Sequence, residues 1–125
     1  PAIDLTIHGI EGHKHITVKA DAIQLRQVFF NILNNSYDAV DKGNGRISVS
    51  VSREDNELRI SFNDNGCGIH EADKEKIFNP FFSTKSKGSG LGLSVCKQII
   101  AFHNGTIDCV SFGSAGTTFI VSFPL

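Results

Sequence analysis

The chain has 125 residues, of which 40% are hydrophobic and 20% charged, and its net charge at neutral pH is −1. This length suffices for one domain with a buried core, and the near-neutral charge argues against a nucleic-acid-binding surface. No apolar run approaches the roughly 20 residues of a membrane span, and the start of the chain does not resemble a signal peptide. Three widely spaced cysteines without a CxxC pair indicate neither a disulfide framework nor a zinc site, and they favour a reducing compartment such as the cytoplasm.

Alternating apolar residues predict strands at the beginning of the chain. Apolar side chains alternate with polar ones over residues 3–7 and again over 16–20. The polar and glycine-containing segment at 9–13 lies between them and is typical of a turn. We therefore expect two strands on either side of this turn.

A long helix is predicted to follow. Asp21, with Gln24 three residues later, resembles a capping box and predicts the start of the helix. Apolar residues at helical spacing form one face, and they are Leu25, Val28, Phe29, Ile32 and Leu33. The sequence GNG at 43–45 predicts that the helix ends near Lys42.

The rest of the chain predicts more strands and a second helix. Clean alternation over 46–54 and 58–62 indicates strands with one buried and one exposed face, which is typical of an antiparallel sheet covered on one side. Two final strands are predicted near 107–110 and 119–123. Together with the helices, these segments predict a two-layer α/β sandwich, in which helices cover one face of a mixed, mostly antiparallel sheet.

The second helix is predicted over residues 91–103. Its apolar positions at helical spacing are Val95, Cys96, Ile99 and Phe102. Asn104 and Gly105 predict its end, and His103 is expected to have a structural role there or to cap the last carbonyls.

A glycine-rich segment, KSKGSGLGLSVCKQII at 85–100, directly precedes and enters this helix. It is not a Walker loop, because the chain has no Gly-Lys pair, and it is not a dinucleotide fingerprint, because Leu93 stands at the position of the third glycine. Gly88, Gly90 and Gly92 would still let backbone N–H groups approach an anion, at the positive end of a helix. The alternative is a flexible surface loop followed by a helix start.

The segment FNDNGCGI at 62–69 places Asp64 at the end of an apolar strand, before two closely spaced glycines. A carboxylate beside backbone without side chains can accept a hydrogen bond from the exocyclic amine of a planar ligand. The alternative is an ordinary turn formed by Asp and Gly.

Polar residues recur along the long helix at spacings of three and four, so they form one stripe. They are Gln24, Gln27, Asn31, Asn34, Asn35 and Asp38. Asparagine is a poor helix former, and Glu or Lys would suit a merely solvated face better. Amide oxygens in this arrangement can complete the coordination shell of a hydrated Mg²⁺ that carries a phosphate.

These segments, in this order, resemble the ATP-binding domain of sensor histidine kinases. QVFFNILNNSYDA is similar to the N box, DNGCGI to the first glycine box, IFNPFFSTK to the phenylalanine box, GSGLGLSV to the second glycine box and GTTF to the third. The resemblance covers essentially the whole chain. It implies the Bergerat-type fold shared with gyrase, heat-shock chaperone and MutL ATPases, with a mobile ATP lid over the triphosphate.

The resemblance implies one catalytic domain over residues 1–125 that binds Mg-ATP and donates the γ-phosphate to a histidine in two-component signalling. That histidine is expected to lie on a separate dimerisation domain, which we expect to be absent from this chain. Since the chain contains no methionine, we expect it to be a fragment of a larger kinase. The expected partners are that dimerisation domain and a response regulator, without nucleic acid or direct membrane insertion, and the isolated fragment is expected to be a monomer. An anti-sigma-type serine kinase and a nucleotide-sensing docking module of the same fold remain as alternatives.

By the same resemblance, Asn35 ligates Mg²⁺ and Asn31, one turn earlier, supports the phosphates. Asp64 accepts a hydrogen bond from the adenine amine, which favours ATP over GTP because guanine presents a carbonyl there. Gly66 and Gly68 let the base approach.

Further roles are implied closer to the phosphates and behind the base. Lys85 is expected to contact the γ-phosphate, and Thr117 to support Asp64 or a bridging water. The segment that lines the triphosphate consists of Ser89, Gly90, Leu91, Gly92 and Leu93. Phe81 and Phe82 are expected to anchor the lid.

One position bears on the reaction. Hydrolysing relatives carry a glutamate as general base four residues before the metal asparagine, whereas this chain has Asn31, which cannot take a proton. The expected reaction is therefore phosphoryl transfer by positioning and charge neutralisation, with Asn31 and Lys85 as the catalytic residues.

Overall fold

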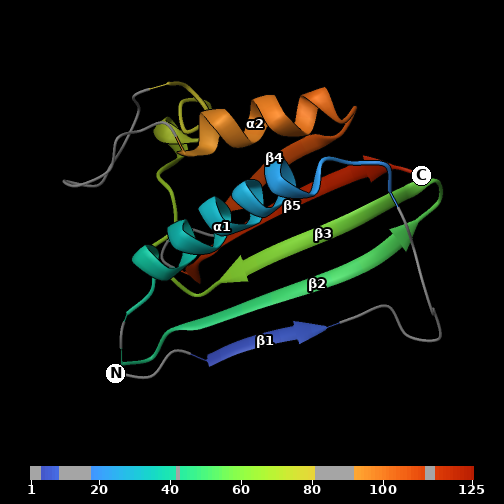
Figure 1. Cartoon of the computed structure of the whole chain (residues 1–125). Helices are drawn as coiled ribbons and strands as arrows, with labels where there is room; N and C mark the ends of the chain where they lie inside the picture. The colour runs from blue at the N-terminus through green and yellow to red at the C-terminus, as the bar shows by residue number, and fades with distance from the viewer. Residues whose placement is uncertain (1–3, 9–17, 42, 81–91, 112–114) are drawn as a thin grey trace.

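A five-stranded sheet with two helices on one face forms the described part of the molecule (Figure 1). The computed structural model describes residues 4–8, 18–41, 43–80, 92–111 and 115–125. The elements in chain order are β1 (Asp4–His8), α1 (Ala22–Ala39), β2 (Arg46–Glu54), β3 (Glu57–Asp64), the short 3₁₀ helix η1 (Glu71–Asp73), α2 (Gly92–Phe102), β4 (Thr106–Ser111) and β5 (Thr117–Pro124). This arrangement confirms the predicted two-layer α/β sandwich. The predicted lid lies outside the described residues.

The strands are ordered β1-β2-β3-β5-β4 across the sheet. β2, β3, β5 and β4 pair antiparallel, whereas β1 pairs parallel to β2. A parallel pair needs a long crossover connection, and α1 lies in the connection from β1 to β2. The prediction of a strand over 16–20 was wrong for residues 18–20, which have no regular structure, while 16 and 17 lie outside the described residues.

The core lies between the sheet and the two helices. It consists of Val28, Ile32, Phe62, Ile77, Cys96, Ile99, Ile100, Ile107, Phe119, Val121 and Phe123. Burial of a large apolar side chain contributes about 1.5–3 kcal/mol, so this layer is the main source of stability. Phe102 was predicted on the apolar face of α2, but it is 78% exposed; it is the last residue of that helix, and its ring meets His103 edge-on.

The predicted N-cap of α1 at Asp21 is confirmed, but the reciprocal bond of a capping box is not made. The Asp21 backbone N–H donates to His103 Nε2 instead, and Gln24 Oε1 is buried without a hydrogen-bond partner among the described residues. Asp21 Oδ1 accepts hydrogen bonds from the backbone N–H groups of Ile23 and Gln24, both at 3.0 Å. The helix ends at Ala39, slightly before the predicted end at Lys42. None of the helices in the described ranges is long and apolar enough to cross a membrane.

His103 joins the end of α2 to the start of α1. Its Nδ1 lies 2.8 Å from the carbonyl oxygen of Ile99, and its Nε2 accepts a hydrogen bond from the backbone N–H of Asp21 at 3.0 Å. Both bonds form together only in the neutral ring with the proton on Nδ1. The expected capping role of His103 is confirmed, and Asn104 ends the helix with a φ of 61°.

We expect His103→Ala to lower the free energy of unfolding by about 1–2 kcal/mol, because both hydrogen bonds and the ring contact with Phe123 are lost. Urea denaturation followed by circular dichroism measures this change. His70→Ala removes an exposed histidine and is the matched control, with an expected change below about 0.5 kcal/mol. Equal losses in the two variants would show that the link between the helices contributes nothing.

Candidate functional site

Asp64 is the centre of the candidate site. It is the last residue of β3, only 4% of its surface is exposed, and its register partner is the equally buried Thr117 on β5. Its Oδ1 accepts a hydrogen bond from the backbone N–H of Gly66 at 2.9 Å. Burial raises the pKa of Asp64 above its ordinary value, although hydrogen bonds from the backbone of Gly66, the Ser36 side chain and the backbone of Thr117 oppose this rise.

The Ser36 hydroxyl lies beside this carboxyl. Ser36 is on α1 and only 1% exposed. Its hydroxyl is close enough to lower the pKa of Asp64, yet it makes no hydrogen bond of regular geometry to a described protein atom. A buried hydroxyl in this state costs free energy unless water or a ligand completes its hydrogen bonding. The pair therefore fits a polar ligand at this end of the sheet.

Glycines allow the backbone to pack closely around Asp64. A Cβ on Gly116, whose φ is +121°, would lie 2.0 Å from the carbonyl oxygen of Asp64. A Cβ on Gly66 would lie 2.6 Å from the carbonyl oxygen of Ala39, at the end of α1. Gly68 has a φ of 76°, which also favours glycine. The glycines that were predicted to let a base approach thus also hold this loop against α1.

The polar stripe of α1 divides into two rows. Gln27 and Asn34 are exposed, whereas Asn31 and Asn35 are half-buried. The side-chain amide nitrogen of Asn31 donates a hydrogen bond to the carbonyl oxygen of Gly92 at 3.4 Å, so Asn31 meets the first turn of α2. The structure therefore brings together one asparagine of the N box and the end of the glycine-rich segment.

Of the residues predicted to line the triphosphate or anchor the lid, some are described by the structure and others are not. Leu93 packs against the core at the start of α2. The residues of the predicted site and lid that lie outside the described ranges are Phe81, Phe82, Lys85, Ser89, Gly90 and Leu91.

The described residues offer no metal site made of strong ligands alone. Within the described ranges, no group of three or more His, Cys, Asp or Glu residues could hold a metal ion. Amide oxygens such as those of Asn31 and Asn35 suit Mg²⁺, but the ion would have to keep several waters and a phosphate as further ligands.

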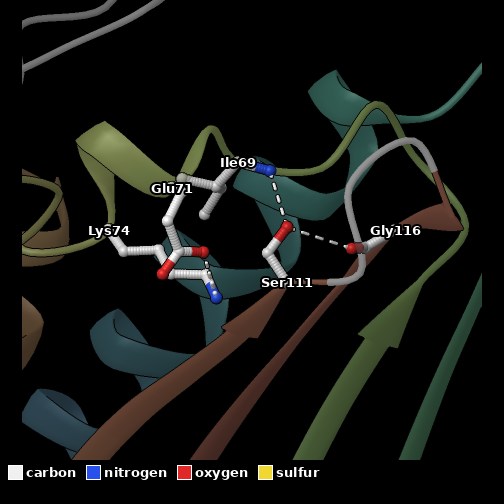
Figure 2. A network of polar contacts seen from close by, with 5 residues as sticks. All are labelled: Ile69, Glu71, Lys74, Ser111 and Gly116. Carbon is white, nitrogen blue, oxygen red and sulfur yellow. Dashed lines mark hydrogen bonds and ion pairs between the residues drawn. The ribbon is translucent and has the colours of Figure 1, made fainter.

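Ser111 has a position that its sequence context did not indicate. Figure 2 shows its hydroxyl between two loops: it accepts a hydrogen bond from the backbone N–H of Ile69 at 2.8 Å and donates one to the carbonyl oxygen of Gly116 at 3.3 Å. Lys74 and Glu71 form an ion pair of 3.0 Å nearby in the same view. Serines recur throughout the strands of this sequence, so nothing local distinguished Ser111.

Two of the three cysteines, Cys96 and Cys109, are unsuited to thiol chemistry. Burial raises the pKa of Cys96 and of Cys109 to about 11, so both thiols are protonated and weakly nucleophilic at neutral pH. The third cysteine, Cys67, is exposed, and all three are free.

Comparison with known proteins places this geometry in a family. The family model described as histidine kinase-, DNA gyrase B- and HSP90-like ATPase matches residues 20–125. Sporulation kinase B of Bacillus subtilis (strain 168) is 36% identical over 114 residues, which cover 91% of this chain and 27% of that protein. The signal transduction histidine-protein kinase AtoS of Escherichia coli (strain K12) is 40% identical over 109 residues, which cover 86% of this chain and 18% of that protein. The chain thus spans about a quarter or less of these curated relatives.

Solved structures agree in both sequence and fold. The nucleotide-free catalytic domain of histidine kinase ThkA is 35% identical with a TM-score of 0.85, over 98% of this chain and 78% of that chain. ThkA in complex with the response regulator protein TrrA is 32% identical with a TM-score of 0.80, over 98% of this chain and 34% of that chain. The chain therefore belongs to the histidine kinase-, DNA gyrase B- and HSP90-like ATPases, and it is the catalytic domain of a sensor histidine kinase.

Proposed function

We propose that this domain binds Mg-ATP at the Asp64 end of the sheet and donates the γ-phosphate to a histidine on a separate dimerisation domain. The observation that carries the proposal is the buried Asp64 carboxyl, with the Ser36 hydroxyl beside it and glycine backbone around it. A carboxyl this deep is costly without partners, and a ligand that donates hydrogen bonds would supply them.

Adenine has the complementary chemistry. Its exocyclic amine donates a hydrogen bond, which a buried carboxylate accepts strongly. Guanine presents a carbonyl at the equivalent position. Its oxygen and the carboxylate are both acceptors, so no hydrogen bond could form between them. The Ser36 hydroxyl, which lacks a regular protein partner, could bond the base directly or through one water. Asp64 would thus select adenine nucleotides.

The phosphates would lie toward the other helix. Asn35 would ligate Mg²⁺ and Asn31 would support the phosphates beside the start of α2, while the backbone of 88–92 and Lys85 would complete the anion site. Mg²⁺ would neutralise phosphate charge there. Since Asn31 cannot accept a proton, the domain would favour transfer over hydrolysis, by positioning the nucleotide and its charge.

The acceptor belongs to another part of the signalling system. We propose that the chain is one catalytic domain of a longer kinase that works in the cytoplasm, and that the phosphoacceptor histidine lies on the dimerisation domain of that kinase. The chain matches only 27% and 18% of the length of two relatives, so those proteins contain further segments that could form such domains. A response regulator is the expected final acceptor, and the complex of ThkA with TrrA supports this class of partner.

We expect the chain to bind ATP and ADP more tightly than GTP in isothermal titration calorimetry. Asp64→Ala should weaken ADP binding about a hundredfold, because a buried, charge-assisted hydrogen bond is lost. Asn35→Ala should abolish the gain in ATP affinity that Mg²⁺ provides. Asn34→Ala, an exposed neighbour on α1, is the matched control and should bind like the wild type. A folded wild-type chain that binds no adenine nucleotide would contradict the proposal.

The raised pKa of Asp64 predicts two opposite pH trends. Affinity for ADP should fall as pH falls through this pKa, which lies above the ordinary 3.8, because the charged acceptor is lost. Without nucleotide, burial favours the protonated carboxyl, so the contribution of Asp64 to stability is fully present below the unfolded pKa and is lost as pH rises through the folded one.

Titration calorimetry and urea denaturation between about pH 4.5 and pH 8 test both trends, with Asp64→Asn as the variant that cannot titrate. The free energy of unfolding of the wild type, relative to Asp64→Asn, should decrease as pH rises, whereas ADP affinity should increase. A constant difference in stability across this range would show that the Asp64 pKa is not raised.

We expect phosphotransfer in trans. The chain, Mg-ATP labelled at the γ-phosphate and the separately expressed phosphoacceptor domain of the full-length kinase should yield an acid-labile phosphohistidine. Replacing the acceptor histidine by alanine should abolish the label. Nucleotide binding without transfer would favour the nucleotide-sensing docking module, and acid-stable phosphoserine would favour the anti-sigma-type kinase.

A further inference from the structure

We infer that Ser111 is a positioning residue for adenine recognition, because its hydroxyl holds together the two loops that flank Asp64. This inference rests on the proposed function and assigns a role to a residue outside the nucleotide-contacting set. Ser111 is the last residue of β4 and is half-buried.

The first of the two loops follows β3 and contains Gly66 and Gly68. Near its start, Gly66 N–H donates to Asp64 Oδ1, and Cys67 N–H donates to the carbonyl oxygen of Ala39 at 3.1 Å. Toward its far end, Ile69 N–H donates to Ser111 Oγ at 2.8 Å. Ser111 therefore anchors the part of the loop that the bonds near Asp64 do not reach.

The second loop leads into β5. Its Gly116 lies against the carbonyl oxygen of Asp64, so closely that a Cβ would come within 2.0 Å. The Ser111 hydroxyl donates to the carbonyl oxygen of Gly116 at 3.3 Å, one residue before Thr117. A hydroxyl has one proton to donate and lone pairs to accept, so a single Ser111 satisfies both loops at once (Figure 2).

The consequence is a fixed separation between the two sides of the adenine site. Gly66, Thr117 and Ser36 face the Asp64 carboxyl from three different segments, and a planar base would have to fit beside them. Hydrogen bonds that hold the loops in place before binding reduce the ordering that the ligand must impose. Loss of the Ser111 hydroxyl should therefore weaken binding of the adenine end without touching the phosphate contacts.

The test compares Ser111→Thr, which keeps the hydroxyl, with Ser111→Val, which has nearly the same shape without it. Binding of ADP and ATP is measured by titration calorimetry, and exchange of the Ile69 amide proton is measured by NMR without nucleotide. Thr118→Val is the matched control, because it removes a strand hydroxyl that bonds Asn63 at 2.8 Å on the exposed side.

We expect Ser111→Val to weaken ADP and ATP equally, by about five- to tenfold, as the loss of one or two hydrogen bonds predicts. Exchange at Ile69 should accelerate in the same variant, while Ser111→Thr and Thr118→Val stay within about twofold of the wild type in ADP affinity.

Three results would overturn the inference. Equal weakening in Ser111→Thr and Ser111→Val would assign the effect to side-chain volume. Wild-type affinity in Ser111→Val, with Ile69 exchange accelerated, would show that the bridge exists but does not position the site. If the wild type binds no ADP although the Ile69 amide proton is still protected from exchange, the proposed function is overturned together with this role of Ser111. This third result differs from the other two because it concerns the wild type.

Discussion

The structure around the candidate site depends on the burial of one carboxyl group. Asp64 ends the central strand β3 and is almost inaccessible to water, so donors from the protein must replace its hydration. The backbone N–H of Gly66 donates to the carboxyl at 2.9 Å, and the backbone of Thr117 and the side chain of Ser36 lie close enough to lower its pKa, so the groups around it come from a loop, a neighbouring strand and a helix. Gly116 has to lack a side chain for its strand to come this close. Burial raises the pKa of Asp64 despite these neighbours, so a ligand that donates another hydrogen bond would favour the charged carboxylate.

Much of the fold could be predicted because its signals are local. The cap at Asp21, the stop at Asn104 and the alternation along β2 and β3 each depend on residues that are close in the chain, and the structure confirms them. The position of β1 in the sheet, in contrast, depends on its pairing with β2, which lies about 40 residues later in the chain. Alternation shows which face of a strand is buried but not which strand lies beside it, so the sequence did not predict that β1 pairs parallel to β2 across α1.

The same distinction applies to the site. Asp64 and the glycines after it have a local signature, because an apolar strand that ends in Asp and closely spaced glycines is unusual in itself. Ser36 and Ser111 have none. Helical spacing from Val28 and Ile32 places Ser36 on the apolar face of α1, but only the packing of α1 on the sheet shows that it lies beside a carboxyl. Ser111 acquires its role from Ile69, 42 residues earlier in the chain. Hydroxyl groups that link distant segments are therefore the part of the site that a sequence does not reveal.

Asn31 shows how structure and chemistry constrain one position together. Its amide nitrogen donates to the carbonyl oxygen of Gly92, and its hydrogen bond to Cys96 lowers the pKa of that thiol against the effect of burial. Both partners lie on α2, so the amide links the two helices where the glycine-rich segment ends. A glutamate there, as in hydrolysing relatives, would have no proton to donate and would place a carboxylate opposite a carbonyl oxygen. This hydrogen bond between the helices would be lost, whereas the apolar core that α1 and α2 share would remain. In this chain, the residue to which we assign the choice of transfer over hydrolysis also makes a polar contact between α1 and α2, so substitution of Asn31 would change the helix contact as well as the proposed chemistry.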